Sequence, residues 1–436
     1  MDRISQIEEN IKSVLLHDAD ELGRETGFIR RQRKLTGSHF VNILVWGSMD
    51  NPALSYSDMS QDAVLAGVSI TAQGLEQRFT EVAARFMKQV LDRSVEKVIQ
   101  ELTPTAIPIL QRFRGVYIRD SSIITLPPQL KDLWPGCGGS EGESAAMKIQ
   151  IRLDYSSGRL EGPALQAGRE HDRHTPFGPD EPPGSLTLSD LGYFSLDELQ
   201  QRDGRGQYFI TRYKVGTALF DCNGERFDLI RWLSSQEGNI AEVQLLLGAK
   251  HRLSVRLIAY RLTQQQADRR RRRLKEYARK KQVMPKKESL ILAGWLIVLT
   301  NLPVEELSAQ EILTIGRVRW QVEILFRVWK SEGFVDKWRS ENPWRILCEI
   351  YAKFIGLLMT HWILLTRWYL FPDLSLAKVR QAVGRLAISF LLALREGISL
   401  RPLLEQVQEL IEQTCRMNKR RAHPATFQIL LALGDS

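Results

Sequence analysis

Cysteine is scarce in this chain of 436 residues. Its four copies are far apart, and no two have the short spacing of a paired metal site, which excludes the common cysteine-based metal motifs. Unpaired thiols are typical of a reducing compartment, so we expect free cysteines and a cytoplasmic location. The four are Cys137, Cys222, Cys348 and Cys415.

Long uninterrupted apolar runs are also missing. The first nine residues lack the apolar region of a signal peptide. The most apolar stretch, residues 346–370, is interrupted by charged and imidazole side chains, which predicts a buried helix instead of a membrane span. The interrupting residues are Glu349, Lys353, His361 and Arg367. We therefore expect no membrane partner.

What the chain has in excess is positive charge. It carries 60 Lys and Arg against 51 Asp and Glu, a formal net charge of +9, with a pI near 9.4. Such a balance favours attraction to a polyanion, although many basic proteins bind no nucleic acid. A hydrophobic content of 43% at this length predicts a sizeable core divided among two to four structural units.

Two aspartates stand at the ends of β-rich runs. Residues 115–120 put Asp120 in or at the edge of a buried strand, and residues 185–190 end on Asp190. A β-hairpin with its turn at 155–158 is predicted between them. A lone aspartate at a strand end is more often a turn or capping group, so the pair becomes informative only with a third acid.

The third acid lies on a predicted amphipathic helix. Arg319 and Glu323 are four residues apart and share a face, and Lys330 lies two turns beyond Glu323. A carboxylate between two cations suits bound metal and phosphate. The alternative is a surface helix that carries ordinary ion pairs.

Three sequence blocks resemble a known family. They are Asp120-Ser-Ser-Ile-Ile-Thr-Leu-Pro, Asp190-Leu-Gly-Tyr-Phe-Ser and Arg319-Trp-x-x-Glu323-x6-Lys330, in that order. They are similar to the signature blocks of the insertion-sequence-four group of DDE transposases, which form hairpins in cut-and-paste transposition. The family pattern has a tyrosine three residues before the arginine, where this chain has Gly316.

The resemblance implies that Asp120, Asp190 and Glu323 are catalytic and bind two Mg²⁺ or Mn²⁺ ions, with Asp120 bridging both. Arg319 and Lys330 would bind DNA phosphates. The chemistry agrees with this assignment, because two such ions can share the activation of a water or 3′-hydroxyl and the stabilisation of the leaving oxygen. Hard cations of this kind bind carboxylates and phosphates without a His or Cys cage.

The resemblance also implies the fold class, an α/β protein. We expect a ribonuclease H-like mixed sheet with flanking helices, interrupted by a β-rich insertion, plus helical N- and C-terminal regions. The expected division is a DNA-binding helical region at 1–105, a first core part at 106–200, an insertion with a basic helix at 201–302, the Glu323 helix at 303–345, and a helical region at 346–436.

Residues 58–79 fit a helix-turn-helix, with a first helix at 58–66 and a second at 70–79. A short helical hairpin in ordinary all-α packing fits equally well, and a glycine in the second helix weakens the pattern. The candidate groove-reading residues are Thr71, Gln73, Gln77 and Arg78.

The insertion combines predicted strands at 207–215, 217–221, 241–247, 253–259 and 289–299 with a basic helix at 264–287. A dense run of one charge sign is often a solvated face, but beside a phosphodiester site it favours contacts to the DNA backbone. The residues concerned are Arg269, Arg270, Arg271, Arg272 and Arg273.

Two smaller features remain open. Trp295 lies in the last predicted strand of the insertion, where the resemblance implies an aromatic that stacks on a flipped base, but a strand tryptophan is more often a core residue. His171, Asp172 and His174 follow the hairpin and are interpreted as structural or phosphate-adjacent.

Taken with the resemblance, the residues predict a cut-and-paste DNA transposase that nicks transposon ends and transfers strands. Its DNA partners would be double-stranded terminal inverted repeats and target DNA. With DNA bound, we also expect a second copy of the chain, and we expect a prokaryotic, nucleoid-associated location. Two alternatives stay open: a ribonuclease H-like nuclease without strand transfer, and a transposase-derived DNA-binding regulator without catalysis, which Gly316 keeps under consideration.

Overall fold

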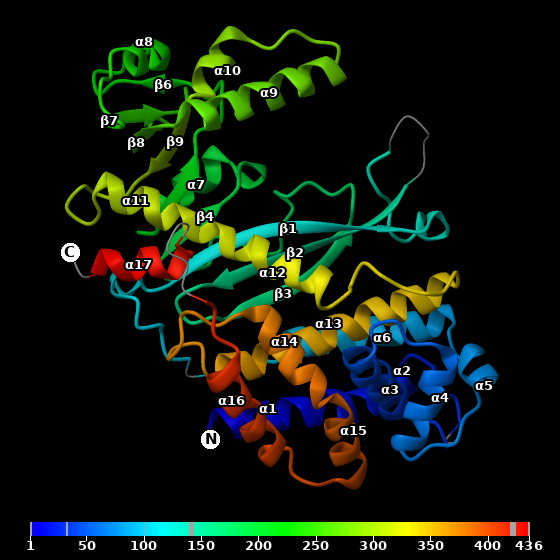
Figure 1. Ribbon diagram of the computed structural model, residues 1–436. Helices are drawn as coiled ribbons and strands as arrows, with labels where there is room; N and C mark the ends of the chain where they lie inside the picture. Colours follow the sequence, from blue (N-terminus) through cyan, green and yellow to red (C-terminus); the bar gives the residue numbers. More distant parts are fainter. Residues whose placement is uncertain (1, 32–33, 101, 139–143, 419–423, 435–436) are drawn as a thin grey trace. The chain divides into compact units, whose positions relative to one another are not determined.

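The computed structural model describes residues 2–31, 34–100, 102–138, 144–418 and 424–434 (Figure 1). Within these, the chain divides into two compact units. One comprises residues 1–106, 121–170 and 321–427, and the other comprises residues 107–120, 171–320 and 428–436. All four cysteines are free thiols, as the sequence predicts.

Nine strands of the described chain form one mixed sheet, in the order β3-β2-β1-β4-β5-β9-β8-β7-β6. β1 pairs in parallel with β4, and β4 pairs in parallel with β5, whereas the β2–β3 hairpin and the pairs among β5 to β9 are antiparallel. With the helical N- and C-terminal regions, this sheet confirms the predicted fold class. The strands are β1 (Val116–Leu126), β2 (Ala145–Asp154), β3 (Leu160–Ala167), β4 (Leu186–Ser189), β5 (Tyr208–Arg212), β6 (Leu219–Phe220), β7 (Ile240–Leu247), β8 (Leu253–Arg261) and β9 (Trp295–Thr300).

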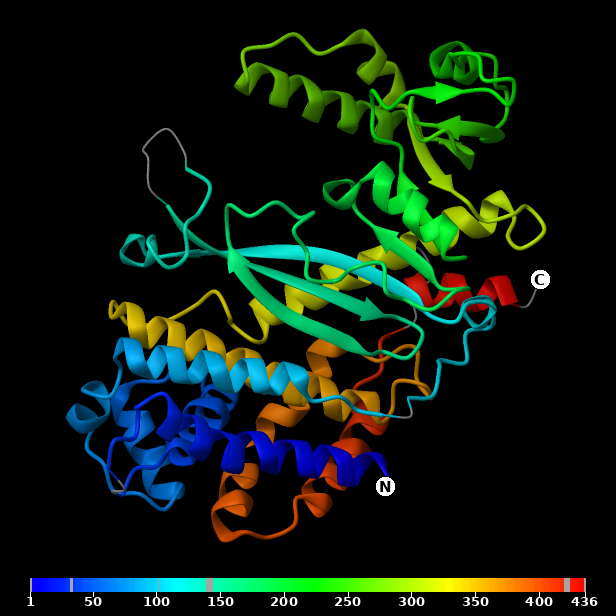
Figure 2. The same ribbon diagram turned by 180° about the vertical axis from the view of Figure 1, so that it is seen from behind.

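The helical unit is organised around α13 (Pro343–Leu365), which packs against α3 and α6 (Figure 2). Among the described residues, α13 is the one helix long and apolar enough to cross a membrane, but its apolar window is completely buried. The prediction of a buried helix is therefore confirmed. The other helices here are α1 (Arg3–Lys12), α2 (Ala19–Glu25), α3 (Gly37–Asp50), α4 (Tyr56–Leu65), α5 (Ala72–Glu76), α6 (Glu81–Glu96), α14 (Leu376–Arg385), α15 (Ala387–Glu396) and α16 (Arg401–Thr414).

Polar groups inside α13 are paired. Nε of Arg345 lies 2.7 Å from Oε1 of Glu349. Burial lowers the pKa of His361 to about 4, so the ring is neutral and its Nε2 donates to the carbonyl of Gly158 at 2.7 Å. These contacts account for polar residues in an otherwise apolar helix.

The second unit carries the insertion on the edge of the sheet. Its core is a cluster of buried aliphatic and aromatic side chains from β5 to β9, including Leu245, Val255, Leu257 and Leu299. The further helices of the chain are α7 (Leu196–Gly204), α8 (Leu229–Ser234), α9 (Gln264–Lys280), α10 (Lys287–Leu292), α11 (Ala309–Ile315), α12 (Trp320–Ser331) and α17 (Thr426–Gly434).

Two element predictions differ from the structure. Residues 289–299 were expected as one strand, but α10 occupies their first part, because a short apolar run alone does not distinguish a helical turn from a strand. The second helix of the predicted helix-turn-helix is only five residues long, and Thr71 caps it instead of lying within it.

Candidate active site

Asp120 and Asp190 lie side by side on neighbouring strands. In the parallel pairing of β1 and β4, Arg119 is the partner of Ser189, so the next residue on each strand is an aspartate. Asp120 lies within β1, which continues to Leu126, and Asp190 follows β4 directly and begins a 3₁₀ turn over Leu191–Tyr193. Both are half-buried. Two carboxylates predicted from separate runs are thus brought together.

Arg319 contacts the first of these aspartates. Its Nη1 lies 3.4 Å from Oδ2 of Asp120, and the two side chains are only 14% and 15% exposed. Arg319 ends a 3₁₀ segment, Gly316–Arg319, that leads into α12. A guanidinium at this separation attracts the carboxylate and compensates its charge. The predicted phosphate-binding arginine is therefore adjacent to a predicted metal ligand.

Helix α12 carries the other two predicted residues. Glu323 lies in its first turn, four residues after Arg319. Val322, Leu325 and Phe326 are buried, as the predicted apolar flank requires. Near the end of the helix, Nζ of Lys330 donates to the carbonyl of Ile123 in β1 at 3.0 Å. Lys330 is therefore held against the strand that contains Asp120.

The aspartate pair fits a hard divalent cation. Across the described ranges, no group of three or more His, Cys, Asp or Glu side chains is close enough to hold a metal ion. Two carboxylates are nevertheless a suitable start for Mg²⁺, which keeps several waters and completes its octahedron with substrate phosphates. Asp120 and Asp190 remain the predicted ligands of such an ion.

The segment with His171, Asp172 and His174 lies against the turn after Asp190. A methyl group built on Gly192 would come within 2.5 Å of Oδ2 of Asp172, so a larger residue there would require this carboxylate to shift. The two imidazole rings are exposed, with their centroids 6.4 Å apart. The sequence did not indicate that Asp172 lies beside Gly192, in the turn that Asp190 begins, because a loop without a recognisable motif separates the two.

Gly316, which replaces the family tyrosine, is helical, with φ −55°. A Cβ at this position would meet only Ile210, at an ordinary contact distance of 3.7 Å. The backbone and the space beside it therefore do not require glycine here.

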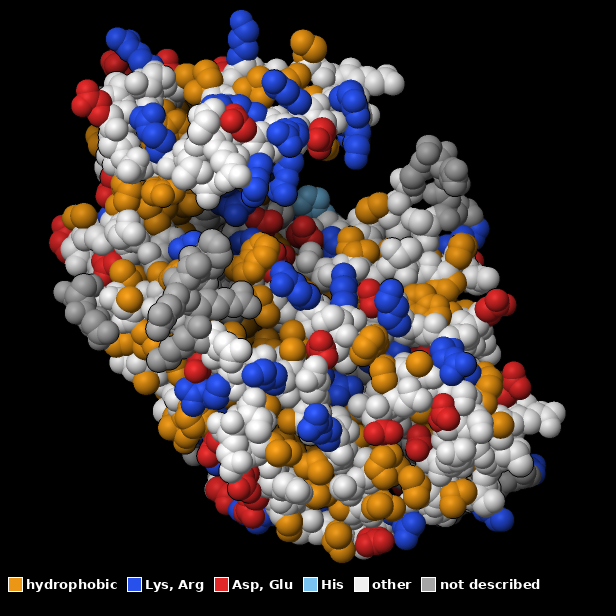
Figure 3. Space-filling view, viewed as in Figure 1, with side chains coloured by type: hydrophobic (Ala, Val, Ile, Leu, Met, Phe, Trp, Pro, Cys, Tyr) orange, Lys and Arg blue, Asp and Glu red, His pale blue; other side chains and the backbone are white. Residues whose placement is uncertain are grey.

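Helix α9 presents a basic surface (Figure 3). Arg269, Arg272 and Arg273 are exposed. Arg270 and Arg271 are half-buried, and their guanidinium groups donate to the carbonyls of Trp295 and Leu290. The predicted run of five phosphate-binding arginines thus contains three exposed side chains and two that also bind the insertion itself.

Trp295 belongs to the core of the insertion. It is 7% exposed within the apolar cluster, and Cζ of Arg261 lies 4.4 Å from its ring centroid. This position favours the core interpretation over the base-stacking one.

Two of the four candidate groove-reading residues line a hollow that also contains arginines. Thr71, Gln73 and Gln77 are exposed and Arg78 is half-buried. Gln77 and Arg78 line a cavity of about 460 Å³ together with Arg30 and Arg31, which the sequence did not single out. Its charge fits the phosphate backbone of DNA better than a base edge.

Comparison with known proteins places these residues in context. A protein-family model described as "Transposase DDE domain" matches residues 111–359, which include Asp120, Asp190 and Glu323. The transposase for insertion sequence element IS231F of Bacillus thuringiensis subsp. israelensis is 28% identical, over 97% of this chain and 94% of that protein. The IS231E transposase of Bacillus thuringiensis subsp. finitimus is 30% identical, over 78% of this chain and 75% of that protein.

One solved structure is also similar. It is the piggyBac transposase synaptic complex with hairpin DNA, with a TM-score of 0.48 and 10% identity, over 97% of this chain and 87% of that one.

Proposed function

Since the chain belongs to the family of DDE transposases and is a transposase of an insertion sequence, we propose that Asp120, Asp190 and Glu323 hold the ions with which it cuts DNA. The single observation that carries the proposal is the β1–β4 register, which puts Asp120 beside Asp190. The position of Glu323, one helical turn after the arginine that contacts Asp120, supports it further.

Two divalent ions, when bound, supply the Lewis acidity that lowers the pKa of a water or 3′-hydroxyl and stabilises the leaving oxygen. The protein's own contribution is to bind and to orient. The carboxylates of Asp120, within β1, and of Asp190, directly after β4, would hold the cations. Arg319 and Lys330 neutralise and align the phosphates beside the scissile bond.

The substrate in this proposal is double-stranded DNA at the terminal inverted repeats, followed by target DNA. The exposed arginines of α9 and the basic hollow at Arg30, Arg31 and Arg78 bind its backbone. Cleavage at both ends of an element requires two active sites, so the DNA-bound form is a homodimer. The reaction is hydrolytic nicking followed by attack of the freed 3′-hydroxyl on the opposite strand and on the target.

The test is cleavage of a matching transposon end by three variants, Asp120→Ala, Asp190→Ala and Glu323→Ala. Each should lose metal-dependent nicking while it still binds the DNA, because each removes a metal ligand and none removes positive charge. The exposed Glu305→Ala is the matched control and should cut normally. Nicking at a near wild-type rate by any of the three would show that the triad is misassigned.

The same assay separates strand transfer from simple hydrolysis. A supplied 3′-hydroxyl end should be joined to target DNA by the wild-type protein. Nicking without joined product would favour the nuclease alternative.

A further inference from the structure

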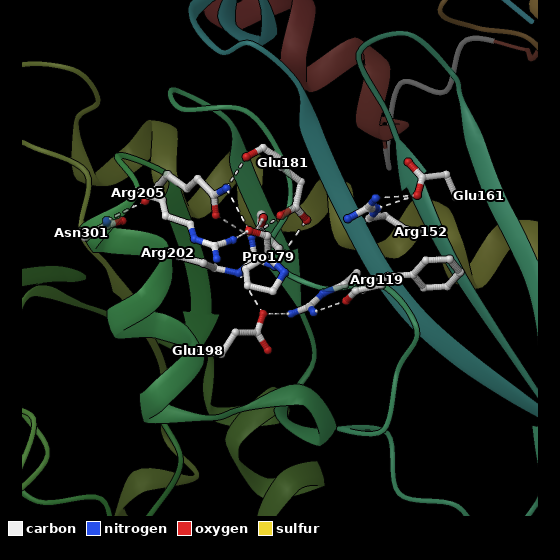
Figure 4. A network of polar contacts seen from close by, with 12 residues as sticks. Arg119, Arg152, Glu161, Pro179, Glu181, Glu198, Arg202, Arg205 and Asn301 are labelled. Carbon is white, nitrogen blue, oxygen red and sulfur yellow. Dashed lines mark hydrogen bonds and ion pairs between the residues drawn. The ribbon is translucent and has the colours of Figure 1, made fainter. Parts of the chain in front are cut away.

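A network of polar contacts includes Arg119, the residue that precedes Asp120 (Figure 4). Arg119 is 2% exposed and Arg202 is 1% exposed. Oε1 of Glu198 lies 2.5 Å from Nη2 of Arg119 and 2.9 Å from Nε of Arg202. Oε2 of Glu181 lies 2.8 Å from Nη1 of the same Arg202 guanidinium. Two arginines and two glutamates therefore balance one another's charge, with Glu181 fully buried and Glu198 22% exposed.

The network connects the two strands that carry the aspartates. Arg119 belongs to β1, and Glu198 and Arg202 belong to α7. Nη1 of Arg202 also lies 2.7 Å from Oγ1 of Thr187 in β4. Helix α7 is thus bonded to β1 through Glu198 and to β4 through Arg202.

Arg119 contacts elements next to both aspartates. It directly precedes Asp120, and successive side chains of a strand point to opposite faces, so the arginine anchors the strand from the face opposite the carboxylate. Its guanidinium carbon also lies 5.3 Å from the ring centroid of Tyr193, in the turn that Asp190 begins. One side chain therefore contacts both α7 and the turn after the second aspartate.

Stability alone does not explain such a network. Taking charges out of water is costly, and apolar residues of similar volume in place of a buried ion pair often leave a protein equally or more stable. What the network does supply is a fixed geometry. Two neighbouring carboxylates repel each other, and a metal site needs them at a defined separation.

We propose that Arg119 and Glu198 are positioning residues that hold β1 and β4 in the register at which Asp120 and Asp190 bind divalent cations. The inference rests on the proposed function and extends it to residues that touch neither metal nor DNA.

The experiment compares two charge-balanced double variants of the full chain. Arg119→Met with Glu198→Gln removes the link to β1 and leaves the Arg202–Glu181 pair intact. Arg345→Met with Glu349→Gln removes a buried pair in α13, far from the aspartates in sequence, and is the control. Mn²⁺ binding without DNA is measured by electron paramagnetic resonance, and thermal unfolding is measured in parallel.

The first double variant should bind Mn²⁺ about 10–100-fold more weakly, the range seen when groups that orient metal ligands are removed. Its cleavage should recover partly at high Mn²⁺, and its DNA affinity should be unchanged. The control should bind Mn²⁺ normally whatever its loss of thermal stability. Arg119→Lys keeps the charge with a single donor group and should lie between wild type and the double variant.

Normal Mn²⁺ affinity in the first double variant would overturn the inference and leave the network a structural one. If that variant fails to fold, Arg119→Lys is measured in the same way, and wild-type affinity there would overturn it equally. Loss of Mn²⁺ binding in Asp120→Ala together with normal binding in the double variant would retain the proposed function and reject only the positioning role. Full cleavage by Asp120→Ala would reject the function itself.

Discussion

The guanidinium of Arg319 lies 3.4 Å from the carboxylate of Asp120, so a proposed metal ligand has a cation beside it. Because a guanidinium and a divalent ion are attracted to the same carboxylate, we expect Arg319 to act as the counter-ion of Asp120 when metal and phosphate are not bound.

This pairing leads to the first prediction. Arg319→Ala should leave weak cleavage, because the metal ligands remain and only phosphate positioning is impaired. Without DNA, the variant should bind Mn²⁺ at least as tightly as the wild type, because a competing cation has been removed. Mn²⁺ titration and nicking rates measure the two effects, with the exposed neighbour Arg317→Ala as control. Mn²⁺ binding as weak as in Asp120→Ala would contradict the counter-ion role.

The second prediction distinguishes the arginines of α9. Glutamine at the exposed positions Arg269, Arg272 and Arg273 should weaken binding to all DNA sequences alike. The slope of log affinity against log salt should become shallower by about 2–3, since each DNA phosphate that the protein no longer neutralises reduces the slope by about 0.9. Arg270→Gln, which removes a bond to the carbonyl of Trp295, should lower thermal stability with a smaller effect on the slope. An unchanged salt slope in the triple variant would mean that these three arginines face solvent and do not contact DNA phosphates.

The third prediction concerns Trp295. Because the ring is buried, Trp295→Ala should lower the free energy of unfolding by about 3–5 kcal/mol, the usual cost of removing a large core aromatic. Nicking and hairpin formation should then fall together, and Trp295→Phe should retain most of both. Chemical denaturation and a strand-resolved cleavage assay measure these effects. Selective loss of hairpins with normal nicking, and partial rescue by an abasic site, would instead support base stacking.

The fourth prediction is a pH dependence in the helical region. Burial, and then the nearby Asp50 and Asp58, raise the pKa of Asp62 to about 6. A raised pKa means that the folded state prefers the protonated form, so stability falls as pH rises from about 4 through about 6. Asp62→Asn should therefore be more stable than wild type at pH 8, by on the order of 1 kcal/mol after solvent screening, and equal to it near pH 4.

Asp58→Asn is the contrasting variant. The pKa of Asp58 is lowered, first by its hydrogen bond from the backbone of Ser55, so this carboxylate stabilises the fold above its unfolded pKa. Its replacement should reduce stability at neutral pH. Thermal unfolding of both variants between pH 4 and 8 measures the two opposite slopes, and parallel slopes would contradict the assignment.

The acids of the site were predictable because each lies in a local pattern that can be recognised without the fold. Asp190 ends a short β-rich run, and Glu323 follows Arg319 at helical spacing. The pairing of Arg119 with Ser189 was not predictable, since it joins residues far apart in sequence and depends on the intervening hairpin being packed first. Residue propensities predict which segments form strands, whereas the register in which two strands pair depends on tertiary contacts.

The network around Arg202 was missed for a related reason. Arg119, Glu198 and Arg202 look like ordinary charged residues in the sequence, and only burial shows that they form one structure. Trp295 was singled out in the sequence, but it lies in the apolar core. The sequence could not distinguish the two roles, because a strand tryptophan has the same local pattern whether it faces a core or a ligand.

Helix α13 is synthesised after α3 and α6, the two helices with which it packs most extensively. Its apolar window has a mean hydropathy of 1.4, enough to compete for lipid or for another chain if it were left uncovered. α3 and α6 precede it in the chain, so their apolar faces are available when it leaves the ribosome. The order of translation therefore shields this segment, and an internal deletion that removes α3 or α6 would turn a core helix into a target for quality-control proteases.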